Sequence, residues 1–369
     1  MVLLHAGGWY FPPRAARLFA HLGPAGGQGK RVLWYGRETR KGSELRANQV
    51  SQRILTVAGV LLVGALCLAT ACGSDSEPGK TPATPAATPT RALSAKPHEP
   101  GTFVETMSSG GMERGYRLHV PPSYDGSTPT ALVVCVHGLR SNALQQERYS
   151  RFSEKADEEG FVVVYPEGSG ALHGWNSAPA AREFLGGPGA DDVLFISELI
   201  TRLEGELCID SGRIYATGIS NGGGMAYRLG CELSGRIAAI GPVAGAYFPL
   251  ASCDVSRPVP AVAFHGTADP LVPYEGTRLL RVMPAIEDWA AQWAQRDGCD
   301  ADPEVFLRKG DVTARRWDGC DDGAEVELYT VDGGGHTWPG APKLPGAKTT
   351  DEVDATDVIW DFFEEHPLR

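Results

Sequence analysis

The chain has 369 residues, 42% of them hydrophobic and 8% aromatic, enough for one large globular domain or two ordinary ones. Its formal charge of −11 is unevenly spread: residues 1–71 carry nine Lys and Arg against two Glu, whereas the remainder carries 25 basic and 43 acidic side chains. A body this acidic repels phosphate backbones, which excludes nucleic acid as a partner and disfavours strongly polyanionic substrates.

An uncharged apolar segment, ILTVAGVLLVGALCLATA, occupies residues 54–71 and follows Arg53. A basic flank, an apolar core and small residues before a cleavage point define a secretory signal. The small residues 69–71 run directly into Cys72, which resembles a bacterial lipoprotein box. We therefore predict a signal peptide with a lipobox over 54–72, lipidation of Cys72, and an extracytoplasmic, membrane-anchored location. The alternative is an uncleaved membrane anchor, because eighteen apolar residues are near the shortest bilayer span.

The segments on either side of this signal have no globular pattern. Residues 1–53 form a basic extension rich in Gly, Arg and Trp, which we interpret as the product of a start codon assigned too early, with the leader beginning near Val50. Residues 73–100 are rich in Pro, Thr and Ala and poor in large apolar side chains. Such a segment cannot bury enough surface to offset its ordering entropy, so we predict a disordered linker.

Residues 101–369 alternate short apolar runs with amphipathic patterns, which predicts a single α/β domain. The apolar runs predict strands at 116–121, 131–136, 161–165, 213–217, 237–243, 259–264 and 325–331. The amphipathic patterns predict helices at 191–207, 288–296 and 356–365. Strands that are apolar on both sides indicate a mainly parallel, doubly wound sheet flanked by helices.

A candidate nucleophile follows the predicted strand at 213–217. The run Gly218-Ile219-Ser220-Asn221-Gly222 matches the G-x-S-x-G turn that projects a serine hydroxyl from the end of a strand. The glycines are needed because a Cβ in so tight a turn would collide with its neighbours. A strand-like run precedes the motif and a helix-compatible run follows it, as this turn requires.

Serine is a weak nucleophile unless a base activates it and an acid orients that base. Asp269 follows the predicted strand at 259–264, and His336 lies in a glycine-rich loop after the strand at 325–331. This order of Ser, acid and His predicts a triad of Ser220, Asp269 and His336. His265 also lies at a strand end, and we interpret it as a structural histidine.

The oxyanion of such a reaction needs two backbone N–H donors. We expect one from Asn221, which follows the nucleophile, and one from the loop after the strand at 131–136. Leu139 is the preferred residue of that loop, and Arg140 is the alternative. Trp175 and Trp338 are candidates for the wall of an apolar or sugar-binding cleft, with ordinary packing an equal alternative.

Six cysteines lie in the predicted domain, and an even number in an exported chain suggests disulfides. Cys299 and Cys320 bracket a twenty-residue excursion that a bridge would close, and Cys231 and Cys253 are a plausible second pair. Cys135 could instead be a buried free thiol. No His or Cys cluster has the spacing of metal ligands, so we expect neither metal nor cofactor.

Seven motifs, in order, resemble those of the polyhydroxybutyrate depolymerase-like esterases, which include feruloyl and acetylxylan esterases. They are HGLRSN, VVYPEG…GWN, DDVLFIS, IYATGISNGGGMAYRLGCEL, IGPVAG, FHGTADPLVPYEG and GGGHTWPG. The resemblance spans about residues 101–365 and implies an α/β-hydrolase without a large lid domain, which uses Ser220, Asp269 and His336 without metal. Many members of the family have a smaller residue at Leu139, which bears on the shape of the acyl pocket.

These observations predict a serine esterase acting on feruloyl, acetyl or polyhydroxyalkanoate-type esters, whose substrate is linked to a polysaccharide or a polyester. A serine peptidase of the same fold and a non-catalytic polymer-binding lipoprotein are the alternatives. The absence of a propeller-like domain argues against the first, and the complete set of candidate catalytic residues argues against the second.

Overall fold

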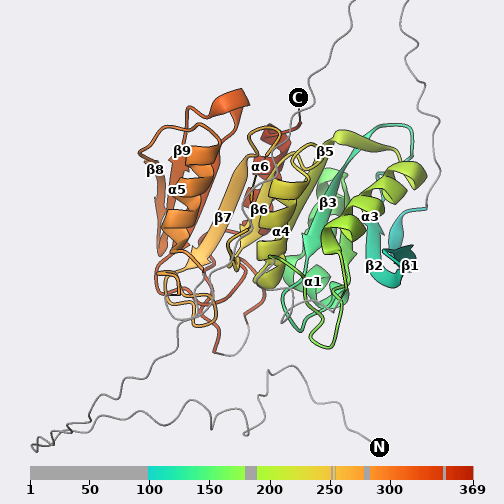
Figure 1. Ribbon diagram of the computed structural model, residues 1–369, viewed down its shortest axis with the longest axis horizontal. Helices are drawn as coiled ribbons and strands as arrows, with labels where there is room; N and C mark the ends of the chain where they lie inside the picture. Colours follow the sequence, from blue (N-terminus) through green and yellow to red (C-terminus); the bar gives the residue numbers. More distant parts are fainter. Residues whose placement is uncertain are drawn as a thin grey trace, which may run out of the picture. The chain divides into compact units, whose positions relative to one another are not determined.

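The computed structural model describes residues 99–178, 189–250, 252–253, 255–277, 283–343 and 346–368. They belong to one compact unit, Thr90–Arg369. Its centre is a ten-stranded sheet with the order β1-β2-β4-β3-β5-β6-β7-β10-β9-β8 (Figure 1). The strands are β1 (Gly101–Ser109), β2 (Met112–Val120), β3 (Thr130–Val136), β4 (Val162–Pro166), β5 (Ile209–Ile219), β6 (Ile240–Val243), β7 (Ala261–Gly266), β8 (Glu304–Lys309), β9 (Val312–Trp317) and β10 (Val326–Val331).

The six central strands, from β4 to β10 in this order, are parallel, whereas β1, β2, β9 and β8 pair antiparallel at the two edges. Strands β3, β4, β6 and β7 are buried almost throughout, as expected for a sheet covered on both faces. Because parallel strands end at the same edge, the loops after β3, β5, β7 and β10 meet there.

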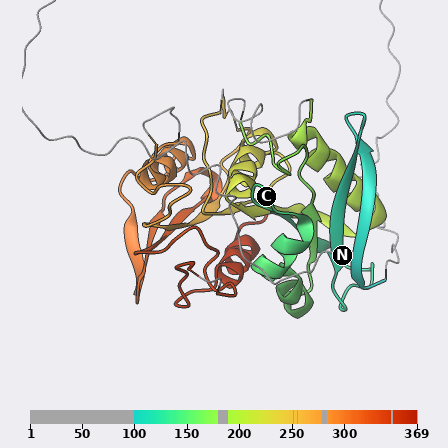
Figure 2. The same ribbon diagram turned by 90° about the horizontal axis from the view of Figure 1, so that it is seen from below.

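Helices cover both faces of this sheet (Figure 2). They are α1 (Ala143–Ser150), α2 (Phe152–Glu159), α3 (Asp192–Glu206), α4 (Asn221–Glu232), α5 (Ile286–Arg296) and α6 (Ala355–Glu365). Apolar residues of α3, α4 and α5 share one core cluster, and those of α1, α2 and α6 share a second cluster on the opposite face. This arrangement confirms the predicted doubly wound α/β fold, and the described residues contain no large lid domain.

All seven predicted strands and all three predicted helices are present, with boundaries shifted by a few residues. The structure adds the edge strands β1, β8 and β9 and the helices α1 and α2. The predicted leader at 54–72, Cys72, the extension at 1–53 and nearly all of the linker at 73–100 lie outside the described residues. In the part of the chain that is described, no helix has both the length and the apolar character needed to cross a bilayer.

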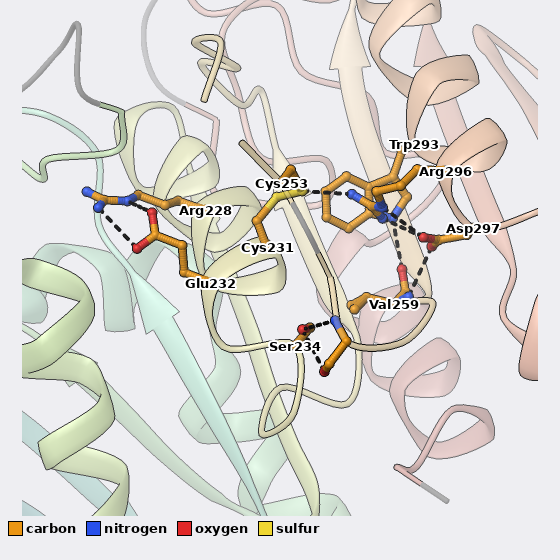
Figure 3. Close-up of a disulfide and its surroundings, with 10 residues drawn as sticks. Arg228, Cys231, Glu232, Ser234, Cys253, Val259, Trp293, Arg296 and Asp297 are labelled. Carbon is orange, nitrogen blue, oxygen red and sulfur yellow. Dashed lines mark hydrogen bonds and ion pairs between the residues drawn. A yellow bond between two sulfur atoms is a disulfide. The ribbon is translucent and has the colours of Figure 1, made fainter. Parts of the chain in front are cut away.

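Two disulfides are formed, and both are predicted pairs. The Cys299–Cys320 bridge closes the excursion that contains β8 and β9. The Cys231–Cys253 bridge joins α4 to the segment before β7, where Arg296 donates a hydrogen bond to Cys253 Sγ (Figure 3). Cys135 is a buried free thiol. Two disulfides fit an extracytoplasmic location, because thiols stay reduced in the cytosol.

Candidate active site

Ser220 lies at the junction between β5 and α4, in a backbone conformation that few residues adopt. Its φ of 61° and ψ of −122° fall outside the common regions for a non-glycine residue. Strain of this kind persists only when the surroundings hold it. Here the Ser220 N–H donates to Val243 O at 3.0 Å, and the Ser220 carbonyl accepts from the N–H groups of Gly224 and Ala246.

Two glycines of the motif make this turn sterically possible. A Cβ on Gly218 would lie 2.4 Å from Val136 O, and one on Gly222 would lie 2.2 Å from the same atom. Both distances are far inside van der Waals contact, and the obstacle is backbone that cannot rotate away. The nucleophile turn therefore packs directly against the end of β3.

Asp269 and His336 are joined by a hydrogen bond. His336 Nδ1 lies 2.7 Å from Asp269 Oδ2, and the Asp269 side chain is fully buried. The loops that carry them are bound to each other, since Ala268 N–H donates to Gly334 O at 2.9 Å and Gly333 N–H donates to Thr267 Oγ1 at 2.8 Å. The structure thus brings together the predicted acid and base, 67 positions apart in the sequence.

The Asp269 carboxylate is held ionised by its donors. Burial alone would raise its pKa, but hydrogen bonds from His265, His336 and the Val272 N–H hold the pKa well below its usual range. Its other oxygen, Oδ1, accepts from the N–H groups of Leu271 at 2.8 Å and Val272 at 2.9 Å. An ionised acceptor fixes the His336 tautomer, with the proton on Nδ1 and the lone pair on Nε2.

Ser220 lies at the same edge of the sheet as this pair, because β5, β7 and β10 all belong to the parallel set. No hydrogen bond joins Ser220 Oγ to His336 Nε2, both of which belong to described residues. In enzymes without substrate such contacts are often long and tighten only in the complex.

Two backbone N–H groups next to Ser220 have no acceptor among the described residues: those of Leu139 and Asn221. By contrast, the Arg140 N–H donates to Leu172 O at 2.9 Å. A Cβ on Gly138 would lie 3.3 Å from Ser220 Cβ, so the loop carrying Leu139 is in contact with the nucleophile turn. Of the two alternatives for the second donor, the geometry favours Leu139.

Trp175 is a structural link between the loop after β3 and the nucleophile helix. Its indole Nε1–H donates to His137 O at 2.9 Å, its backbone N–H donates to Asn221 Oδ1 at 2.7 Å, and Asn221 Nδ2 donates to its carbonyl. His137 is itself fully buried; burial lowers its pKa to about 4, and its Nε2 accepts from the Gly168 N–H at 2.9 Å. We did not predict from the sequence that His137 would accept hydrogen bonds from Trp175 and Gly168. Its position beside Gly138 at the end of a strand was a usable signal.

The proposed role of the two tryptophans as cleft walls needs correction. Both indoles are fully buried. Trp338 packs edge-on against Phe152 and donates from Nε1 to Thr356 Oγ1 at 3.0 Å. The structure favours the packing alternative for both, because neither ring presents a face to solvent that a substrate could contact.

A buried ion pair stabilises the backbone next to Trp175. Arg114 on β2 lies 2.8 Å from Asp192 Oδ1 at the start of α3, and both side chains are almost completely buried. Asp192 Oδ2 also accepts from the Asn176 N–H at 2.7 Å. This pair was not predicted, since the two residues are 78 positions apart and Arg114 lies in no recognisable motif, although Asp192 belongs to the motif DDVLFIS.

Comparison with known proteins gives the family. A model described as "Esterase PHB depolymerase" matches residues 114–286. A protein of Nocardia uniformis subsp. tsuyamanensis named as an esterase, NocK, is 30% identical over 352 residues, covering 85% of this chain and 98% of that protein. The chain belongs to the polyhydroxybutyrate depolymerase-like family of esterases. It is thus a carboxylic ester hydrolase with the serine hydrolase fold.

Two further similarities cover smaller parts of this chain. Feruloyl esterase B of Piromyces equi is 31% identical over 231 residues, which cover 58% of this chain but 41% of that longer protein. The solved acetyl xylan esterase from Aspergillus awamori superposes with a TM-score of 0.53 at 15% identity, covering 71% of this chain and 99% of that one. The second comparison shows the shared α/β-hydrolase fold. Among the described residues of this esterase, no cluster of His, Cys, Asp or Glu side chains could hold a metal ion.

Proposed function

We propose that this esterase hydrolyses carboxylic esters through a Ser220–His336–Asp269 triad and an acyl-enzyme. His336 Nε2 takes the hydroxyl proton as Ser220 Oγ attacks the ester carbonyl. The N–H groups of Asn221 and Leu139 then stabilise the oxyanion, His336 protonates the leaving alcohol, and water releases the acid by the same steps in reverse. The Asn221 donor also lies at the N-terminus of α4, where the helix dipole favours negative charge.

One observation carries this proposal: the 2.7 Å contact between His336 Nδ1 and the buried, ionised Asp269. It leaves the lone pair of His336 on Nε2, the atom that must accept the serine proton. The strained φ of Ser220 and the two unused N–H groups support the same assignment.

For the substrate, we propose an ester whose acyl group is feruloyl, acetyl or a hydroxyalkanoate, linked to a polysaccharide or a polyester. The names of the related feruloyl and acetyl xylan esterases support the first two. A panel of feruloyl, acetyl and 3-hydroxybutyryl esters, ranked by kcat/KM, tests the choice among the three.

Turnover of short p-nitrophenyl esters by the wild type and by Ser220→Ala tests the mechanism. Loss of the nucleophile should lower kcat by roughly 10⁴-fold or more, and it should abolish labelling by a fluorophosphonate. Comparable rates for both proteins would exclude Ser220. Faster cleavage of amides than of the matching esters would favour a peptidase, and a folded wild type that is neither active nor labelled would be a binding protein.

We further propose that the esterase is exported and held at a membrane through lipidated Cys72. The apolar segment at 54–71 and the small residues before Cys72 support this. Labelling of cells with an alkynyl fatty acid should mark the wild type and leave Cys72→Ala unmarked. A wild type that stays in the membrane fraction without taking up the label would favour the uncleaved anchor.

A further inference from the structure

His265 is a second histidine beside the Asp269 carboxylate, on the side away from solvent. It lies in β7 and its side chain is fully buried. Along β7, Ala261 and Ala263 belong to the core cluster under α4 and α5, so the alternation of the strand directs His265 to the same face.

The contacts of His265 define its tautomer. Its Nε2 lies 2.9 Å from Val272 O, and a carbonyl can only accept, so Nε2 carries the proton. The Nε2 atom also lies 3.4 Å from Asp269 Oδ2, a longer contact than the one to Val272 O. The other nitrogen, Nδ1, is buried with no partner among the described residues, as expected for the unprotonated nitrogen of a neutral ring.

Asp269 Oδ2 is therefore shared between two imidazoles. His336 donates to it from the solvent side at 2.7 Å, and His265 approaches it from the interior at 3.4 Å. Since Oδ1 is already occupied by two backbone N–H groups, Oδ2 alone transmits the charge of the carboxylate to His336.

We propose that His265 is a positioning residue that sets the basicity of His336 by sharing the Asp269 Oδ2 atom. This inference rests on the proposed triad. A donor on Oδ2 withdraws negative charge from the hydrogen bond with His336. Without that donor the carboxylate stabilises the His336 imidazolium more strongly, and the base loses its proton only at higher pH.

Other charged groups near His265 are few and are occupied. The Tyr274 ring centre lies 6.1 Å from that of His265, and its hydroxyl donates to Glu287 on α5 and contacts Thr330 on β10. Glu287 in turn accepts from Arg315 of β9 at 2.8 Å. The Asp269 carboxylate, which is paired with His336, is thus the charged group that lies directly beside His265.

Two substitutions in the full chain separate positioning from plain structural support. His265→Met introduces an apolar side chain of similar length that has no hydrogen-bond donor. His265→Gln instead places an amide N–H near the position of Nε2. Tyr274→Phe is the matched control, because it loosens the same 269–276 segment without touching Asp269. For each protein, kcat and KM for a p-nitrophenyl ester are measured between pH 4 and pH 9.

We expect His265→Met to raise the pKa on the acid limb of kcat/KM by about half a unit to one unit. Below that pKa, kcat should fall about three- to tenfold while KM stays within twofold. His265→Gln should restore most of the wild-type profile, and Tyr274→Phe should leave the limb in place. A His265→Met protein with lower thermal stability and an unshifted limb would overturn the inference, as would failure of Gln to restore the profile.

A measurement on the wild type covers the case in which the variants do not fold. Nitrogen NMR of histidine-labelled protein should show His265 protonated on Nε2 and bare on Nδ1 across the titration of His336. The opposite tautomer would overturn the inference. Failure of the triad itself has a different signature, namely Ser220→Ala retaining activity, so the two outcomes cannot be confused.

Discussion

At the scale of single residues, the tightest constraint in the site is at Gly222. A Cβ there would lie 2.2 Å from Val136 O at the end of β3 and 2.5 Å from His137 O in the loop that carries the proposed oxyanion donor, and both are backbone atoms. The turn cannot relieve this overlap without moving Ser220. Displacement of a reacting group by about 1 Å can cost about 10²-fold in rate.

We therefore predict that Gly222→Ala lowers kcat at least about 100-fold and destabilises the fold by about 1–3 kcal/mol. Ester turnover and thermal unfolding measure the two effects. Gly205→Ala is the matched control: its Cβ would meet nothing within 4 Å, and it lies exposed near the end of α3, so activity should be unchanged and stability equal or slightly higher. A Gly222→Ala enzyme with wild-type kcat would contradict the close packing of the turn.

Single residues also show how far sequence reasoning reaches. Ser220, Asp269 and His336 could be selected because each follows a strand of the parallel set, and the fold brings such positions to one edge. The indole of Trp175 could not be assigned, because a sequence does not show whether an aromatic ring faces a cleft or the interior. The role of His265 depends on a contact with Asp269 that only the loop geometry reveals.

At the scale of secondary structure, the parallel strands were predictable because each contains a run of mostly apolar residues, and β4 and β7 are buried along their whole length. The edge strands were not. In β8 four of the six residues are exposed, and β9 carries two arginines, so neither has the apolar run that marks a central strand. Helices α1 and α2 are short and largely polar, and they obtain their stability from packing on β3 and β4 rather than from their own pattern.

The contact between β2 and α3 depends on the buried Arg114–Asp192 pair. Arg114→Met would leave the Asp192 carboxylate buried without its cation, which costs about 3–5 kcal/mol in comparable sites. We predict a loss of that size in chemical denaturation, together with reduced activity, because Asp192 also holds the Asn176 N–H beside Trp175.

The double substitution Arg114→Met with Asp192→Leu should recover much of the stability, since no unpaired charge remains. Arg202→Gln is the control at a partly exposed pair, with Glu105, and should cost about 1 kcal/mol or less. If Arg114→Met cost no more than Arg202→Gln, the pair could not be holding α3 against the sheet.

At the scale of the whole molecule, the two disulfides link different elements of the fold. Each closes a loop of about twenty residues, which corresponds to about 3 kcal/mol of loop entropy in the unfolded chain. Cys320 follows β9 near the start of β10, at the edge of the sheet opposite His336. Cys231 instead lies in α4, the helix that begins at the nucleophile.

We predict that replacing both Cys299 and Cys320 with Ser lowers the unfolding free energy by about 3 kcal/mol but leaves kcat at 25 °C within twofold. The Cys231→Ser, Cys253→Ser pair should lose similar stability and also lose activity at lower temperature, because α4 positions Ser220. Denaturation curves and activity against temperature distinguish the two. Identical activity curves would show that the bridge on α4 does not support the nucleophile turn.

The stability of the whole domain should depend on pH through Glu327, a nearly buried carboxyl on β10. Burial raises its pKa from 4.5 to about 7, despite the hydrogen bonds that Arg316 donates to it at 2.6 and 2.9 Å. Burial likewise raises the pKa of Asp297 to about 6. A carboxyl with a raised pKa holds its proton more tightly in the folded state than in the unfolded state, so its contribution is complete below pH 4.5 and is lost as the pH rises to about 7.

Two groups act in the opposite sense. Asp269 does so only below its ordinary pKa of 3.8, but the buried His137, whose pKa is lowered from 6.5 to about 4, adds stability as the pH rises through the same window. The contribution of Glu327 is therefore isolated by comparing Glu327→Gln with the wild type. We predict that the two proteins unfold at the same temperature at pH 4.5 and that the variant melts a few degrees higher at pH 8, because the amide has no charge to bury. Thermal unfolding of both proteins across this range measures the effect, and a difference that does not change with pH would contradict the raised pKa of Glu327.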